Sequence, residues 1–113
     1  MEQVNVQRLL LSLGLCARAR ALIFGVPMIC DGMRKGGKNS PILVLEAADT
    51  SQNTHKRLTD KCSYYNTRHV RLLCTGEELA AAVGKSSSIG AVAITDGNFV
   101  RLIEKNIQSN QIH

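Results

Sequence analysis

The chain has 113 residues, of which 44% are hydrophobic, so it is long enough to bury a core and too apolar to be disordered. Fourteen lysines and arginines against nine aspartates and glutamates give a net charge of +5 and an isoelectric point near 9.3. That balance favours a polyanionic partner, above all nucleic acid. We expect a single domain over residues 1–113, with a frayed tail over 108–113.

Cysteine usage and hydropathy indicate the compartment. No pair among the four cysteines has the Cys-x-x-Cys spacing, and no histidine lies at ligand spacing from any of them: Cys16, Cys30, Cys62 and Cys74. We therefore expect reduced, mostly buried thiols and neither a metal site nor a disulfide. The first residues lack the basic start of a signal peptide, and no apolar run reaches the length that spans a bilayer. The sequence thus predicts a soluble cytoplasmic protein without membrane contact.

The N-terminal segment is predicted to form an amphipathic helix over residues 4–19. Asn5 is a residue type that caps helices and would begin it. One stripe of this helix is apolar and is expected to face the core: Val6, Leu10, Leu13 and Ala17.

A short strand over residues 21–24 and a second helix follow. Pro27 suits the first turn of that helix, and the pair Gly36-Gly37 ends it. Gly25 lies between the strand and the helix, where unpaired backbone amides could bind a phosphate or a base edge. The alternative is an ordinary turn that uses glycine for its backbone freedom.

Strands and helices alternate through the rest of the chain. The apolar runs predict strands over residues 42–46, 69–74 and 89–95. Capping residues and helical periodicity predict helices over 51–65 and 75–84, and a last one capped by Asp96. This alternation favours a three-layer α/β/α sandwich around a small, mainly parallel sheet.

Residues 32–39, GMRKGGKN, match a phosphate-binding loop except at Asn39, where a hydroxyl should bind magnesium. Such a loop leaves a strand and enters a helix, whereas here a helix precedes Gly36 and a strand follows Pro41. The match is therefore accidental. What remains is a basic turn, whose cations either contact phosphate or only complement the helix dipole: Arg34, Lys35 and Lys38.

Four segments carry a resemblance to a known family: LLLSLGLCARARALIFG, ILVLEAADTSQNTHKRLTDKCSYYN, EELAAAVGK and AVAITDGNFVRLI. Through them, residues 5–107 resemble the kink-turn RNA-binding L-seven-Ae/L-thirty-e ribosomal protein superfamily, and most of all its small bacterial YlxQ-type members. The resemblance implies a three-layer α/β/α sandwich with a four-stranded mixed sheet. It also implies a non-catalytic, cofactor-free protein that binds ribosomal or other structured, kink-turn-like RNA.

The resemblance further implies an RNA-binding edge made of the turn at 25–28, the basic helix end at 34–38 and the loop at 85–89. The candidate RNA-binding residues are Gly25, Val26, Pro27, Arg34, Lys35, Lys38, Lys85 and Ser87. Typical RNA-binding members have Asn-Glu after the glycine turn and a lysine further on, where this chain has Pro27, Met28 and Asp31. A lost base contact costs about 1–3 kcal/mol in duplex DNA. We therefore expect contacts mainly with phosphates, which are salt-dependent and weakly selective.

Two other classes of function remain open. A protein–protein interaction module on the same scaffold would use the apolar surface at 26–29, unless those residues are partly buried in the core. An enzyme is not expected, because His55, His69 and His113 are scattered and no serine or cysteine is paired with a base. Asp49 and Asp96 are most simply explained as helix caps. The expected partners are RNA and ribosomal proteins, and the expected state is a monomer.

Overall fold

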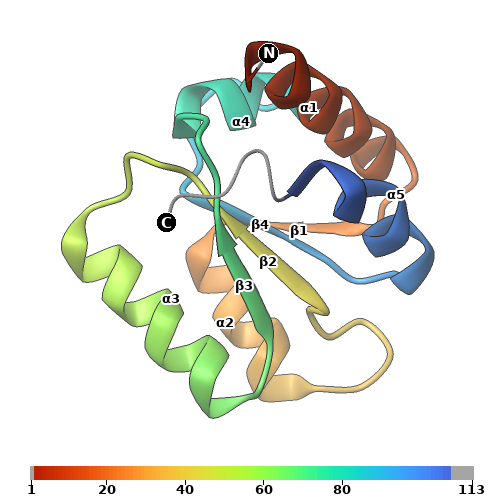
Figure 1. Cartoon of the computed structure of the whole chain (residues 1–113). Coiled ribbons are helices and arrows are strands. Elements are labelled where there is room, and N and C mark those ends of the chain that lie inside the picture. Colours follow the sequence, from red (N-terminus) through yellow and green to blue (C-terminus); the bar gives the residue numbers. More distant parts are fainter. Residues whose placement is uncertain (1, 108–113) are drawn as a thin grey trace.

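The computed structural model describes residues 2–107, so the expected frayed tail at 108–113 lies outside the described residues. The elements follow one another as α1 (Glu2–Arg18), β1 (Leu22–Phe24), α2 (Val26–Lys35), β2 (Leu43–Glu46), α3 (Gln52–Tyr64), β3 (Arg68–Arg71), α4 (Gly76–Ala82), β4 (Ala91–Ile94) and α5 (Gly97–Ile107). The strands form one sheet in the order β1-β4-β2-β3, with helices on both faces (Figure 1). The predicted α/β/α sandwich with a four-stranded mixed sheet is confirmed.

The direction of the strands corrects the expectation of a mainly parallel sheet. β2 pairs with β3 in parallel, but β4 is antiparallel to both of its neighbours, β1 and β2. Three strands therefore run one way, and the last strand inserts between two of them in the opposite direction. Alternation of strands and helices does not report such an insertion, because it says nothing about the order of the strands in the sheet.

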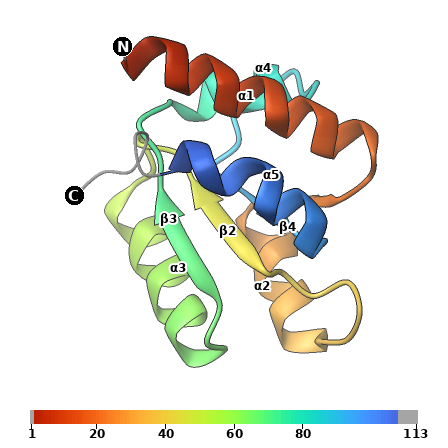
Figure 2. The same ribbon diagram turned by 45° about the vertical axis from the view of Figure 1, so that its right-hand side comes forward.

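Each face of the sheet has its own core, because side chains alternate along the strands. On one face, Leu43 and Leu45 pack with α1, α4 and α5. On the other face, Val44 packs with α2 and α3. Figures 1 and 2 show these two helical layers on opposite sides of the strands.

Two predicted details of the elements are wrong, and a third is incomplete. The first helix begins at Glu2, so Asn5 lies inside it and does not cap it. The expected core-facing stripe is incomplete: Leu13 is fully buried, and Val6, Leu10 and Ala17 are partly buried and pack against the core. Two further side chains, those of Leu9 and Cys16, are also fully buried. The strand predicted over 69–74 ends at Arg71, because the chain turns toward Thr75, whose capping box starts α4.

Among the described residues, no helix is long and apolar enough to cross a membrane.

Candidate nucleic-acid interface

The turn between β1 and α2 exposes backbone hydrogen-bond donors. Gly25 caps α2 with φ 87° and ψ 148°, a conformation that glycine adopts most easily. No side chain caps this helix, and Pro27 has no amide hydrogen. The amides of Val26 and Met28 therefore have no partner inside the helix, and they are available to an anion.

An open pocket of about 480 Å³, which we call the turn pocket, lies against this turn. The β1–α2 turn contributes Gly25, Val26 and Pro27; the segment after β2 contributes Asp49, Thr50, Thr54 and Arg57; and the loop before β4 contributes residues 88–90. These segments approach closely, since a Cβ added to Gly90 would lie 3.3 Å from Cγ2 of Thr50 and 3.7 Å from Cγ2 of Val26. The turn and the loop that the sequence singled out thus meet across one pocket.

The candidate residues of that loop lie beside the pocket, not in its lining. The Lys85 ammonium lies 4.4 Å from the centroid of the Phe24 ring, a cation–π contact at the end of β1. Ser87 is exposed and directly precedes the lining residue Ser88. Both side chains are therefore near Gly25 and accessible to a large ligand.

The basic end of α2 forms a separate group of charges. A ten-residue helix is about 15 Å long, so Arg34 and Lys35 lie well away from Gly25. Both pair with Asp31: Arg34 at 2.5 Å and Lys35 at 3.1 Å. The hydrogen bond from Arg34, followed by that from Lys35, lowers the pKa of Asp31. Lys38 is exposed in the following loop, after Gly37 with φ 85°.

Five residues of the turn pocket were missed in the sequence: Asp49, Thr50, Thr54, Arg57 and Gly90. Leu58 and Cys62 form the buried stripe of α3. That stripe sets which neighbouring positions are exposed, but only the packing of α3 against α2 places Arg57 beside the turn. Thr54 and Arg57 are three residues apart on α3 and so share one face of the helix, and this spacing was the available signal.

A buried carboxylate lies next to the turn pocket. Glu46 has no exposed surface, and its Oε1 lies 2.8 Å from Nδ1 of His55 and 2.8 Å from Nε2 of His69. The Thr50 hydroxyl donates to Oε2. Burial acts to raise the pKa of Glu46, but the hydrogen bonds from His69, Thr50 and His55 together outweigh it and lower the pKa to about 2. The ionised carboxylate of Glu46, on β2, thus holds Thr50 in the wall of the turn pocket through this hydrogen bond.

The same cluster corrects the expectation that the histidines are scattered. His55 and His69 meet at Glu46, while His113 lies outside the described residues. Within residues 2–107 these three side chains could hold a metal ion, with ligand atoms within 4.8 Å of one another. The nitrogens, however, lie 2.8 Å from the carboxylate oxygen, closer than the roughly 3.3 Å that separates tetrahedral zinc ligands. The geometry is that of hydrogen bonds that stabilise a buried charge.

The thiols are poorly placed for nucleophilic chemistry. All four cysteines are free and buried, as the sequence predicted. Burial raises the pKa to about 11 for three of them: Cys16, Cys62 and Cys74. A thiol with such a pKa stays protonated at neutral pH and reacts slowly.

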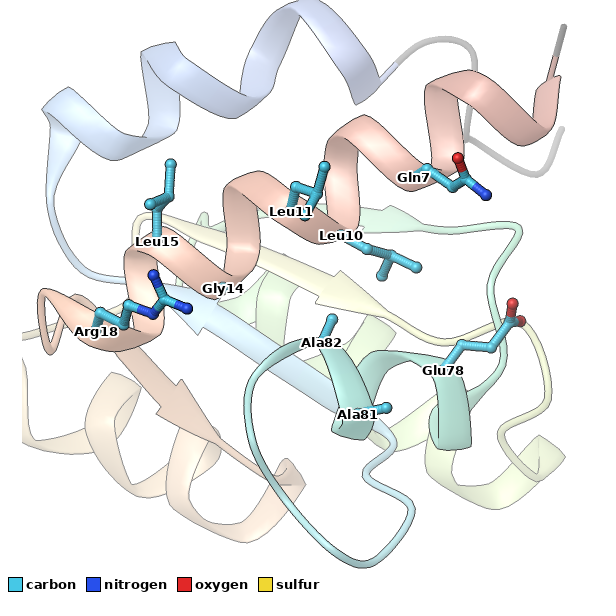
Figure 3. Close-up of a pocket in the computed structure, with 9 residues that line it drawn as sticks. All are labelled: Gln7, Leu10, Leu11, Gly14, Leu15, Arg18, Glu78, Ala81 and Ala82. Atoms are coloured by element: carbon cyan, nitrogen blue, oxygen red, sulfur yellow. The ribbon is translucent and has the colours of Figure 1, made fainter.

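A larger pocket of about 760 Å³ lies between α1 and α4 (Figure 3). Its walls are mainly apolar: Leu10, Leu11, Gly14, Leu15, Ala81 and Ala82. Arg18 and Glu78 lie toward opposite ends of it (Figure 3). An apolar wall is unsuited to a polyanion, and this pocket shares no lining residue with the turn pocket.

Comparison with known proteins identifies the family, although no family model matches the chain. The chain is 34% identical over 87 residues to the RNA-binding protein YlxQ of Bacillus subtilis (strain 168), which covers 77% of this chain and 82% of that protein. It is 29% identical over 108 residues to the RNA-binding protein YlxQ of Enterococcus faecium, and the match covers 96% of this chain and 99% of that protein.

Two solved structures have the same fold. A protein with unknown function from Bacillus halodurans gives a TM-score of 0.78 at 29% identity, over 89% of this chain and 97% of that one. The 15.5kD RNA binding protein of Giardia lamblia gives a TM-score of 0.74 at 17% identity, over 94% of this chain and 87% of that one. At this identity the likeness is one of fold alone. The fold is that of a class of α/β/α sandwiches that includes this protein of Giardia lamblia. Within this class, the chain belongs to the YlxQ family.

Proposed function

We propose that the protein binds structured RNA, mainly through phosphates and without catalysing a reaction. The observation that carries the proposal is the turn pocket, where free amides at the start of α2 adjoin the exposed Arg57, with the exposed Lys85 beside the pocket. It is supported by the similarity to relatives named RNA-binding protein YlxQ and by the net charge of +5.

The side chains of the turn favour phosphate contacts over base reading. Pro27 has no polar side-chain atom, and Met28, 59% exposed, offers only a weakly accepting sulfur. Asp31 carries a negative charge where the superfamily resemblance implies a lysine, and its charge is balanced by Arg34 and Lys35. Amides and cations remain as donors, and they recognise a phosphate without reading sequence.

The finer assignment is a ribosome-associated protein or a ligand of kink-turn-like RNA, with ribosomal proteins as further partners. We place it in the cytoplasm, where its free thiols stay reduced. We further propose that it is a single domain over residues 1–113 and acts as a monomer, without a cofactor.

A mobility-shift titration tests this function. The probes are a kink-turn RNA, a scrambled hairpin of equal length and intact ribosomal subunits, each at about 50 and 200 mM salt. We expect binding to structured RNA that weakens steeply with salt, and less than about tenfold preference for the kink-turn over the scrambled hairpin. Failure to bind any of the three at low salt would refute RNA binding.

The second candidate is a protein–protein interaction module that has lost kink-turn base readout. The exposed Met28 beside the exposed Pro27 favours it, because they form an apolar surface at the position of the base reader. Ile29 is fully buried and Val26 half-buried, so the surface is smaller than the sequence suggested. A pull-down that survives ribonuclease and high salt but fails with Met28→Ser would support this candidate.

A further inference from the structure

A second hollow, which we call the α2–α3 furrow, continues from the turn pocket. Its volume is about 230 Å³, and its lining residues come from α2, α3 and the residue that follows α3. Figures 1 and 2 show α2 and α3 side by side on this face of the sheet. It shares Pro27 and Arg57 with the turn pocket. A strand of nucleic acid that contacts the turn can therefore pass Pro27 and enter the furrow without leaving the surface.

The furrow is positively charged. Its lining includes three cations and one anion: Arg34, Arg57, Lys61 and Asp31. Asp31 is engaged by Arg34 and by Lys35 on its own helix. Its negative charge is thus balanced on α2 and does not offset the charge of Arg57 and Lys61 across the furrow.

The cations of α3 fall into two groups. Lys56 forms an ion pair with Asp60 at 2.7 Å on the exposed surface of the helix. Within residues 2–107, neither Arg57 nor Lys61 has an ion pair, and both are exposed at the furrow. Like charges that face one hollow repel one another, and an anionic ligand relieves that repulsion.

Spacing along α3 also suits a nucleic-acid backbone. Arg57 and Lys61 are one helical turn apart, which is about 6 Å along the axis, close to the separation of successive phosphates on one strand. Guanidinium and ammonium groups are the side chains that bind phosphate most strongly. A protein ligand with apolar anchors would find few partners among these charges.

We propose that the α2–α3 furrow is a second RNA-backbone subsite, in which Arg57, Lys61 and Arg34 bind phosphates of the strand that leaves the turn pocket. This inference rests on the proposed RNA-binding function and extends it to α3, whose residues were not among those expected from the sequence. It predicts a longer footprint on the RNA than the turn at Gly25 and the loop at 85–89 provide alone.

The test compares two double variants of equal net charge. Arg57→Gln/Lys61→Gln removes two unpaired cations of the furrow. Lys56→Gln/Lys105→Gln is the control, because Lys56 is paired with Asp60 on the same helix and Lys105 lies on α5, in the opposite layer. The probe is the kink-turn RNA of the mobility-shift experiment, titrated over a range of salt concentrations. All four side chains are exposed, so circular dichroism spectra should match that of the unchanged protein.

Each phosphate contact contributes roughly 0.7–0.9 to the slope of log K against log salt. The furrow variant should therefore reduce this slope by about 1.4–1.8 and weaken binding about 25- to 60-fold at about 0.1 M salt. The control should change affinity by less than about threefold, since exposed charges away from the RNA are largely screened.

The outcomes separate this inference from the proposed function. Equal losses in both double variants would mean that only net charge matters, and a furrow variant that binds like the unchanged protein would mean that the RNA does not enter the furrow. Either result overturns the subsite and leaves RNA binding intact. If the unchanged protein binds none of the RNA probes, the proposed function fails and the subsite fails with it.

Discussion

Replacing Glu46 by glutamine should remove a specific, acid-sensitive part of the stability. Glutamine keeps the size of the side chain but removes the charge that His55, His69 and Thr50 stabilise by hydrogen bonds. The pKa of Glu46 falls from an ordinary 4.5 to about 2 in the folded protein. At 1.36 kcal/mol for each pH unit, this corresponds to about 3 kcal/mol of stability.

The sign follows from the lowered pKa. A carboxylate whose pKa is lower in the folded state stabilises the protein fully above the unfolded value of 4.5. The contribution disappears as the pH falls through the folded value of about 2. The free energy of unfolding of the unchanged protein should therefore exceed that of Glu46→Gln by about 3 kcal/mol or more at neutral pH. This difference should shrink steadily between about pH 5 and pH 2.

Urea unfolding followed by far-ultraviolet circular dichroism measures this difference at each pH. Glu104→Gln serves as the control, because Glu104 is 53% exposed and pairs with Arg68 on the surface. That substitution should cost less than about 1 kcal/mol at any pH. A difference for Glu46→Gln that stays constant from pH 5 to pH 2 would refute the assigned ionised state of Glu46.

Three further outcomes follow from the structure. Gly25→Ala should lower the free energy of unfolding by about 1–3 kcal/mol in urea melts, because of its positive φ, whereas Gly97→Ala, in open space, should change it little. A thiol reagent at neutral pH should label Cys16, Cys62 and Cys74 only as fast as the protein opens, and rapid labelling of these three in the folded state would contradict their raised pKa. Replacing Arg34, Lys35 and Lys38 by glutamine neutralises the basic turn, and the slope of log K for RNA binding against log salt should then fall by about 2–3. An unchanged slope would exclude this turn from the interface.

The elements that could be predicted from the sequence are those that depend on local signals. Pro27 in the first turn of α2, the capping residue Thr75 and the buried run of β2 each report on their own neighbourhood, and each prediction was correct. The insertion of β4 between β1 and β2 is a property of the whole sheet, so no local pattern contains it. The stripe predicted for α1 does pack against the core, but Leu9, Leu10 and Leu11 are all apolar, and only the packing against α4 and α5 shows that Leu9 is the fully buried one.

The same distinction holds for the site. The turn at Gly25 was a candidate because glycine follows a predicted strand there, and the loop before β4 was a candidate only through the family resemblance; the structure places both at one pocket. The contact of Glu46 with His69 requires the parallel register that places Glu46 beside Arg71 and Val44 beside His69. Such contacts between distant residues became visible only with the sheet in place.

The distribution of charge decides which helix makes the stronger phosphate contacts. On α2, Asp31 occupies both Arg34 and Lys35, so RNA must compete with an existing partner for each of them. On α3, Arg57 and Lys61 have no such competitor within the described residues, and binding there gains the full relief of their mutual repulsion. For equal exposure, a phosphate would therefore gain more free energy at α3 than at α2, which supports the proposed extension of the RNA interface from the turn toward Arg57 and Lys61.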